Sequence, residues 1–453
     1  MSKTFKAAAI SEFARYYGFH YDHIDSSSLV EDVLIEMERG LNGHTSSLPM
    51  IPAYIRAASG TTPGKTVIAL DAGGTNLRSA LVTFDENGKA VAADTRKAPM
   101  PGTLGPLGAD AFFDEIAAIV APLIREAGGK IEGIGFCFSY PMEITKDADG
   151  ILMAFSKEVD APEVIGSSIG KGLKDALARQ NVPVPERIVL LNDTVATLLS
   201  GLSELPAHGG LRRGKDLYGV EAGPIVGFIL GTGFNTAYPE KRIPKIGFDS
   251  HNAPQIVVCE TGNFTHRYMG VLDREHDSAT KNPGAYTLEK AAAGAYLGPL
   301  TFHILKQALH DGLFSFARQD EFLALPALQT KDIDPFLHEP LARTGPIGEL
   351  FGADERDAIA SFMYIASIIT QRGALLSAAM VAAAVEKTGA ASDPLVPARI
   401  AVEGTTYVRY KGMRSALESY LHVMLNRHKP RAFAIAPVEQ ASLFGAAVAA
   451  GGH

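Results

Sequence analysis

The chain has 453 residues, of which 46% are hydrophobic and 20% are charged, and its formal net charge at pH 7 is -8. This length is too great for one compact core and suits two lobes, while the composition is ordinary for a globular enzyme in water. The acidic balance argues against a nucleic-acid partner, because such proteins are expected to carry a basic bias.

The N-terminal segment is interrupted early by Glu12 and Arg15, so we expect no signal peptide and a cytoplasmic location. The most apolar run, 362–385, is split in the middle by polar residues and predicts one or two buried helices; no membrane partner is expected. The two cysteines, Cys137 and Cys259, lie inside apolar runs and predict buried thiols without a disulfide framework.

Residues 3–42 are predicted to be helical, with Ser26–Ser28 as cap-like residues ahead of apolar positions at helical spacing. The pattern then changes to that of strands. Residues 66–93 predict an apolar strand, a glycine turn and a second strand, and Asn87 with Gly88 is a hairpin turn signal. The glycine turn thus joins two strands, whereas in a P-loop or Rossmann unit it joins a strand to a helix.

The following segments alternate between helix and strand, which is typical of an α/β fold. A helix is predicted over 110–127, and later segments predict a strand (IEGIGFCFSYP), a helix (KGLKDALARQ) and a buried strand (RIVLLND). Residues 224–240 repeat the earlier pattern of apolar strand, Gly-Thr turn and resumed strand. One such loop in each half predicts two related lobes that face one nucleotide. The polar, glycine-rich segment 203–223 between them predicts a surface insertion.

The first glycine turn is a candidate phosphate loop. Its glycines let backbone amides approach phosphate oxygens closely, and Asp71 at the end of the strand is placed to hold Mg²⁺ through water. Thr75 and Arg78 are placed to contact phosphate. A plain hairpin with an exposed aspartate would have the same short pattern, but the second turn at 231–233 favours phosphate binding.

A carboxylate, Asp193, leaves a buried strand where the next helix begins. A helix N-cap is the ordinary explanation for one such aspartate. An Asn-Asp pair between two phosphate loops favours a second explanation, because phosphoryl transfer to an alcohol uses a carboxylate that accepts the hydroxyl proton. Asp193 is therefore the candidate general base, with Asn192 beside it.

Several motifs stand in the order and spacing of the hexokinase family, and the chain resembles that family from about residue 46 to 448, with 203–223 outside the match. The motifs are LDAGGTNLR, FCFSYP, LLNDTVATLL, LGTGFNTAY, NPGAYTLEKAAAGAYLG and VEGTTY. The resemblance implies an ATP-dependent hexokinase that phosphorylates the 6-hydroxyl of a hexose, with glucose as the expected hexose and with ATP and Mg²⁺ as cofactors. It implies two actin-like (RNase H-like) lobes with an interlobe cleft. The small lobe would be 62–191 plus 435–453, and the large lobe 1–61 plus 192–434.

The resemblance also implies which residues form the site. Carboxylates and amides bind vicinal hydroxyls well and reject analogues that lack them. The sugar would be bound by Ser139, Ser156, Lys157, Asn192, Asp193, Asn235, Glu260 and Glu289. ATP would be bound by Asp71, Gly73, Gly74, Thr75, Asn76, Arg78, Gly231, Thr232, Gly233, Gly404, Thr405 and Ser442, with Asp71 also as the metal residue.

The chain departs from the family pattern at a few of these positions. The family has Thr-Lys where this chain has Ser156 and Lys157, and Glu-Trp-Gly where it has Glu260, Thr261 and Gly262. It usually has Asp-Gly where this chain has Glu403 and Gly404. Near the end, a motif rich in glycine keeps its serine, Ser442, and loses two glycines. The departures are therefore concentrated at the adenosine end.

Two rival functions share parts of this pattern. A non-catalytic sugar sensor would not need Asp193 with two phosphate loops, and an ATPase of the actin or chaperone type would not need the FSYP motif or the two glutamates. GTTPGKT at 60–66 resembles a Walker A motif but precedes a strand. Residues 166–170 match G-x-S-x-G, yet Ser167 or Ser168 is expected to cap a helix.

Overall fold

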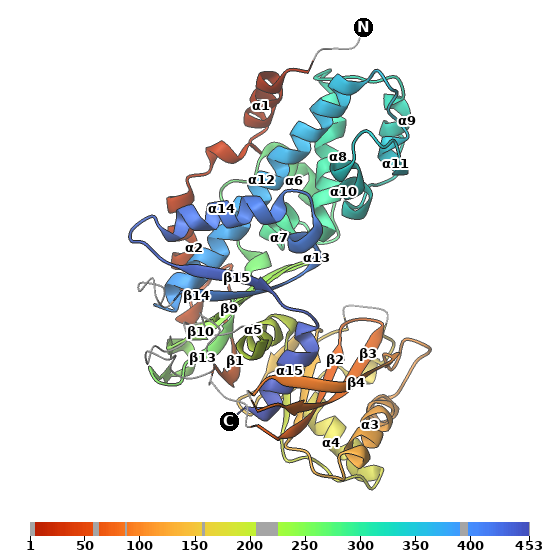
Figure 1. The fold of residues 1–453 in the computed structure, drawn as a ribbon, viewed down its shortest axis with the longest axis vertical. Helices are drawn as coiled ribbons and strands as arrows, with labels where there is room; N and C mark the ends of the chain where they lie inside the picture. Colours follow the sequence, from red (N-terminus) through yellow and green to blue (C-terminus); the bar gives the residue numbers. More distant parts are fainter. Residues whose placement is uncertain are drawn as a thin grey trace.

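The structure is a computed structural model that describes residues 5–57, 63–86, 88–155, 159–204, 225–389 and 397–452. In it, two large β-sheets flanked by helices form two lobes, one above the other in Figure 1. This mixed α/β arrangement confirms the predicted fold class. The exact lobe boundaries stay a prediction.

The sheet of the small lobe carries the first glycine turn. Its strands, in spatial order, are β4 (Ala90–Pro99), β3 (Asn76–Phe84), β2 (Thr66–Ala72), β5 (Ile134–Phe138) and β8 (Ile188–Leu191). β2, β3 and β4 are antiparallel, whereas β5 and β8 run parallel to the strand before them. The pairing of Phe84 with Ala90 confirms the hairpin; Asn87 lies outside the described residues.

Helices cover both faces of this sheet, so its apolar strands are buried on both sides (Figure 1). Two helices predicted from their spacing lie against one face, and a C-terminal helix packs against β2 and β5. These helices are α3 (Ala109–Glu126), α4 (Ile169–Arg179) and α15 (Ala441–Gly451). Ser168 accepts a hydrogen bond from the Lys171 amide at the start of α4, which confirms the capping role at this G-x-S-x-G sequence.

The sheet of the large lobe repeats the pattern of the first. Its strands, in spatial order, are β1 (Ile51–Arg56), β13 (Gln255–Val258), β10 (Phe234–Glu240), β9 (Ile225–Leu230), β14 (Ala398–Glu403) and β15 (Phe433–Pro437). β9, β10 and β13 are antiparallel, and β14 and β15 follow in parallel. The strand–turn–strand units β2–β3 and β9–β10 are therefore equivalent, as the repeated sequence pattern predicted.

One long helix of the large lobe packs against several of its neighbours (Figure 1). This helix, α12 (Arg356–Lys387), is a single helix across the apolar run, and 94% of its most apolar window is buried. It is the one helix of the described residues that length and composition would allow to cross a membrane. The others are α1 (Ala7–Tyr16), α2 (Ser26–Leu41), α5 (Asp193–Glu204), α6 (Val271–Ser278), α7 (Thr287–Ala292), α8 (Gly294–His310), α9 (Gln319–Leu323), α10 (Thr330–His338), α11 (Gly345–Gly348), α13 (Thr405–Arg409) and α14 (Met413–Leu425). Short strand pairs are β6 (Met142–Ile144) with β7 (Gly150–Leu152), and β11 (Arg242–Ile243) with β12 (Phe248–Asp249).

The N-cap of α2 corrects the sequence prediction. The capping residue is Asp25, whose carboxylate accepts a hydrogen bond of 2.7 Å from the Ser28 amide. The three serines lie inside the first turn instead. A carboxylate at this position also interacts favourably with the positive end of the helix dipole.

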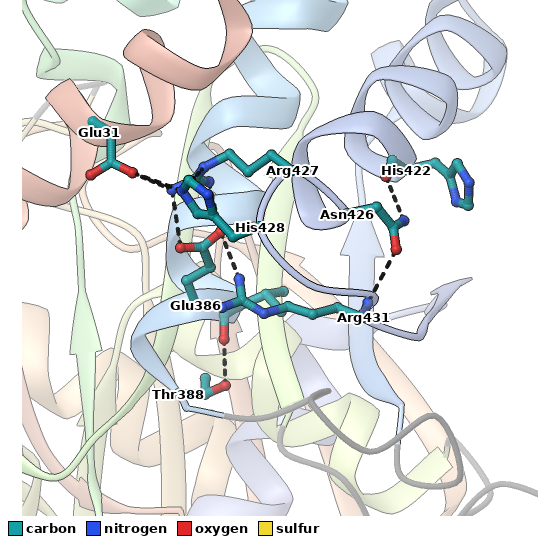
Figure 2. A network of polar contacts seen from close by, with 9 residues as sticks. Glu31, Glu386, Thr388, His422, Asn426, Arg427, His428 and Arg431 are labelled. Carbon is teal, nitrogen blue, oxygen red and sulfur yellow. Dashed lines mark hydrogen bonds and ion pairs between the residues drawn. The ribbon is translucent and has the colours of Figure 1, made fainter.

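A polar network links the end of α12 to neighbouring elements (Figure 2). Glu386 accepts hydrogen bonds from Arg427 (2.6 Å) and makes an ion pair with Arg431 (2.6 Å). Arg427 also donates to Glu31 of α2 at 2.7 Å. The Arg427 and Glu386 side chains are only 5% and 11% exposed, so their ion pair is buried, whereas Glu31 is 52% exposed. The network joins α2, α12 and the segment after α14.

Both cysteines are buried and neither forms a disulfide, as predicted. The Walker-like segment 60–66 is described only from Pro63 onward, where it leads into β2. Most of the predicted insertion at 203–223 lies outside the described residues.

Candidate functional site

Two adjoining cavities lie between the sheets. One has a volume of about 530 Å³ and the other about 430 Å³. Asp193 and Ser139 line both cavities, together with Gly233 and Ile229. The candidate base therefore stands at the junction of two spaces that could each hold one substrate.

The first cavity brings together most of the predicted sugar-binding residues, from both lobes. Ser156 and Lys157 lie outside the described residues. The polar side chains that line it, apart from two tyrosines, are Ser139, Asn192, Asp193, Asn235, Asn263, Glu260 and Glu289.

Glu260 lies two residues after the end of β13 in a left-handed backbone conformation, with φ of 56°. Such a conformation is costly for a residue with a side chain and often occurs at functional sites. Its carboxylate accepts a hydrogen bond of 3.0 Å from the Asn235 side-chain amide. Burial, with the nearby charges of Asp193 and Glu289, raises the pKa of Glu260.

Glu289 reaches the same cavity from α7. Its Oε2 accepts a hydrogen bond of 3.1 Å from the Phe234 amide, directly after the second glycine turn. Burial raises the pKa of Glu289 also, and Asp193 contributes in the same direction, while the Phe234 amide acts against this. Three carboxyl groups thus share one electrostatic environment, although they come from separate elements.

The start of α5 separates the two roles that the sequence left open for Asp193. Asn192 is the capping side chain, because its Oδ1 accepts a hydrogen bond of 2.9 Å from the Val195 amide. Asp193 occupies the first position of the helix itself, where its Oδ1 accepts from the Thr194 hydroxyl at 3.2 Å. Helix capping therefore does not account for Asp193.

The second cavity is lined by nearly all of the predicted nucleotide-binding residues. Gly74 is the exception, since its carbonyl instead accepts a hydrogen bond of 2.8 Å from the Tyr140 hydroxyl. Tyr140 belongs to the FSYP motif. Its hydrogen bond holds the first glycine turn in place, a role that the sequence did not indicate. The lining residues include Asp71, Gly73, Thr75, Asn76, Arg78, Gly231, Thr232, Gly233, Glu403, Gly404, Thr405 and Ser442.

Gly404 explains how the second turn and the end of β14 come so close together. Its φ of 127° suits glycine alone, and a Cβ at this position would lie 2.3 Å from the Leu230 carbonyl oxygen. The Thr406 hydroxyl also holds the second glycine turn, because it donates a hydrogen bond of 2.8 Å to the Gly231 carbonyl. The result is a narrow backbone cradle, which is the kind of surface that approaches phosphate oxygens.

The acidic residues of the second cavity suit a magnesium ion carried by the nucleotide. Among the residues that the structure describes, no three His, Cys, Asp or Glu side chains are grouped to hold a metal by themselves. Asp71 lies opposite Arg78 on the neighbouring strand, and its Oδ2 is 3.6 Å from the Arg78 Nη1. Mg²⁺ commonly binds through one or two carboxylates, several waters and substrate phosphates, so Asp71 fits such a partly protein-bound ion.

Glu403 is a site residue that the sequence analysis noticed only as a departure from the family pattern. Its side chain lines the second cavity and lies 3.4 Å from the Thr197 hydroxyl of α5. Burial, followed by the charges of Asp193 and Asp71, raises the pKa of Glu403 to about 7. The sequence could indicate that Glu403 is buried, because it ends an apolar strand. It could not indicate the two neighbouring carboxylates, because these come from distant parts of the chain.

This raised pKa predicts a pH-dependent stability. Between the ordinary glutamate value of about 4.3 and about 7, the folded chain keeps the Glu403 proton that the unfolded chain releases. The stability contributed by this group is therefore greatest at low pH and falls as pH rises through that window. We expect Glu403→Gln to lose less thermal stability than the parent between about pH 5 and pH 8. Parallel melting-temperature curves for the two proteins would contradict the assignment.

The chain is similar to hexokinases in both sequence and fold. Family models described as hexokinase match residues 11–202 and 225–451. The chain is 27% identical to Hexokinase-7 of Oryza sativa subsp. japonica over 439 residues, which cover 92% of this chain and 91% of that protein. It is 29% identical to Hexokinase-1 of Schizosaccharomyces pombe over 435 residues, covering 91% of this chain and 84% of that protein. Among solved structures, a hexokinase from Schistosoma mansoni complexed with glucose superimposes with a TM-score of 0.73 at 22% identity, covering 99% of this chain and all of that one.

Proposed function

The chain belongs to the hexokinase family and is a sugar kinase, and from this premise we propose that it transfers the terminal phosphoryl group of ATP to the 6-hydroxyl of a hexose, with glucose preferred. The observation that carries the proposal is the position of Asp193, which lines both the first and the second cavity. A phosphoryl acceptor and a phosphoryl donor would meet at this carboxylate.

In the proposed reaction, the hexose occupies the first cavity. Glu260, Glu289 and Asn235 hydrogen-bond its ring hydroxyls, and Asn235 already orients Glu260. Asp193 accepts the proton of the primary hydroxyl as that oxygen attacks phosphorus. Asn192 provides the helix cap beside it.

The glycine turns would bind the phosphates of ATP in the second cavity. Backbone amides of these turns and the Thr75, Thr232 and Arg78 side chains supply donors toward charge that develops on the transferring group. Mg²⁺, when bound with Asp71 and the ATP phosphates, supplies positive charge that neutralises the developing phosphate charge. The apposition of the two lobes would exclude water as a competing acceptor.

The test is a panel of hexoses with ATP and Mg²⁺. We expect ADP release that depends on hexose, the largest kcat/KM with glucose, and a product identified as the 6-phosphate by phosphorus NMR. Mannose and fructose are the informative competitors, because each alters the hydroxyls near C2 or the ring. The glucose-bound state of the solved Schistosoma mansoni relative supports glucose as the first choice. ADP release without any sugar would favour an ATPase, and sugar binding without phosphorylation would favour a sensor.

A further inference from the structure

Helix α7 carries Glu289 into the first cavity, although it is only six residues long. So short a helix has little stability of its own in water. It is preceded by Tyr286 in a left-handed conformation, with φ of 55°, and by Gly284 with φ of 78°. The position of Glu289 must therefore be fixed by contacts outside the helix.

Lys290, the residue after Glu289, does not line the first cavity and is only 4% exposed. Its ammonium group donates to the Asp277 carboxylate of α6 and, at 2.7 Å, to the Asn282 carbonyl. The other carboxylate oxygen of Asp277 accepts a hydrogen bond of 2.8 Å from the Gly284 amide. This buried pair holds both the helix and the loop that leads into it.

The same segment is bonded to the second glycine turn. The Ala293 amide donates to the Glu289 carbonyl at 2.8 Å, which ends α7. The next two amides, of Gly294 and Ala295, donate to the Gly231 and Thr232 carbonyls at 2.8 and 3.0 Å. A displacement of α7 would thus move Glu289 directly and would reach the second glycine turn only through these hydrogen bonds.

We propose that Lys290 and Asp277 are positioning residues for hexose binding, which act through Glu289. This inference rests on the proposed function, since it takes Glu289 to contact the sugar. A buried ion pair is weak evidence for stability by itself, because the cost of desolvation offsets much of its attraction. Its place directly behind a substrate-binding carboxylate supplies a different reason for its presence.

The first test is Lys290→Met, which keeps much of the side-chain length and removes the ammonium group. We expect KM for the hexose to rise about tenfold or more, the size of one lost charged hydrogen bond. We expect kcat to change little, because binding that is equal in ground and transition states appears in KM. KM for ATP should change far less, since the Thr406 hydroxyl also holds Gly231. Asp277→Asn, which is isosteric and leaves an acceptor for Gly284, should have the same effect if Lys290→Met does not fold.

Two comparisons separate positioning from a general loss of stability. Glu386→Gln weakens a buried ionic contact (Figure 2) whose residues line neither cavity; it should lower the melting temperature but leave the hexose KM unchanged. In a Glu289→Gln background, Lys290→Met should raise KM little further, because residues that act as one unit are non-additive.

The proposal is overturned if the parent phosphorylates hexose and Lys290→Met and Asp277→Asn bind it as tightly as the parent does. It is also overturned if Glu386→Gln raises the hexose KM equally, or if the Lys290 and Glu289 effects simply add. An inactive parent would instead reject the proposed function, so the two failures are distinguishable.

Discussion

Asp193→Ala is expected to lower kcat by roughly 10²- to 10⁴-fold, the usual range for removal of a general acid or base. The physical reason is that the primary hydroxyl of a sugar is a weak nucleophile unless its proton is accepted during attack. Hexose binding should largely survive, because Asn235, Glu260 and Glu289 remain in the first cavity. The measurement is kcat with saturating hexose and ATP, alongside hexose affinity by titration calorimetry, which suits a chain without tryptophan.

The fold of this variant should be intact, which makes the kinetic result interpretable. The N-terminus of α5 keeps its cap, since the Asn192 side chain makes that hydrogen bond. Asp193→Asn is the matched variant, because it preserves shape and hydrogen bonding while removing the basic oxygen. If either variant turned over at near the parental rate, Asp193 would not be the base.

Glu260→Ala is expected to raise the hexose KM by roughly 10²-fold, because a charged hydrogen bond contributes about 1.5–3 kcal/mol. The loss has two parts. The carboxylate that would accept sugar hydroxyls is removed, and the Asn235 side-chain NH₂ loses its acceptor at 3.0 Å, although the Asn235 Oδ1 still accepts from the Thr236 amide at 2.8 Å. The substitution should not relieve the strain of the left-handed backbone at residue 260, because alanine is also disfavoured in that conformation.

Initial rates over a range of hexose concentrations check this prediction, with KM for ATP as the internal control. KM for ATP should stay near the parental value, because Glu260 does not line the second cavity. Glu260→Gln should be milder than Glu260→Ala, since the amide keeps one acceptor oxygen. Equal loss of affinity for hexose and ATP would indicate a general distortion instead of a lost sugar contact.

Much of the fold could be predicted because alternating apolar runs and glycine turns are local signals. The strand–turn–strand units around Gly73 and Gly231 were visible as a repeat, and the structure places them in equivalent positions of two sheets. Caps were harder to predict. The Asp25 cap of α2 was missed because adjacent polar residues compete for the role, and their order of preference depends on the local backbone.

The candidate site was predicted in part, for a related reason. Motif order identified residues that point into the cavities, such as Glu289, but said nothing about what holds them there. Lys290 and Asp277 are thirteen positions apart and lie on different helices, so no short sequence pattern links them. Glu403 likewise acquires its raised pKa from Asp193 and Asp71, which only the folded chain brings near.

The two equivalent sheets exchange their last helices. Helix α5 follows β8 of the small lobe but packs against β9 and β14 of the large one, whereas α15 follows β15 and packs against β2 and β5 (Figure 1). Where the two helices meet, a Cβ on Gly445 would lie 2.0 Å from the Ala196 carbonyl oxygen, so backbone touches backbone. A side chain at position 445 would therefore force α5 and α15 apart at the contact that joins the two sheets.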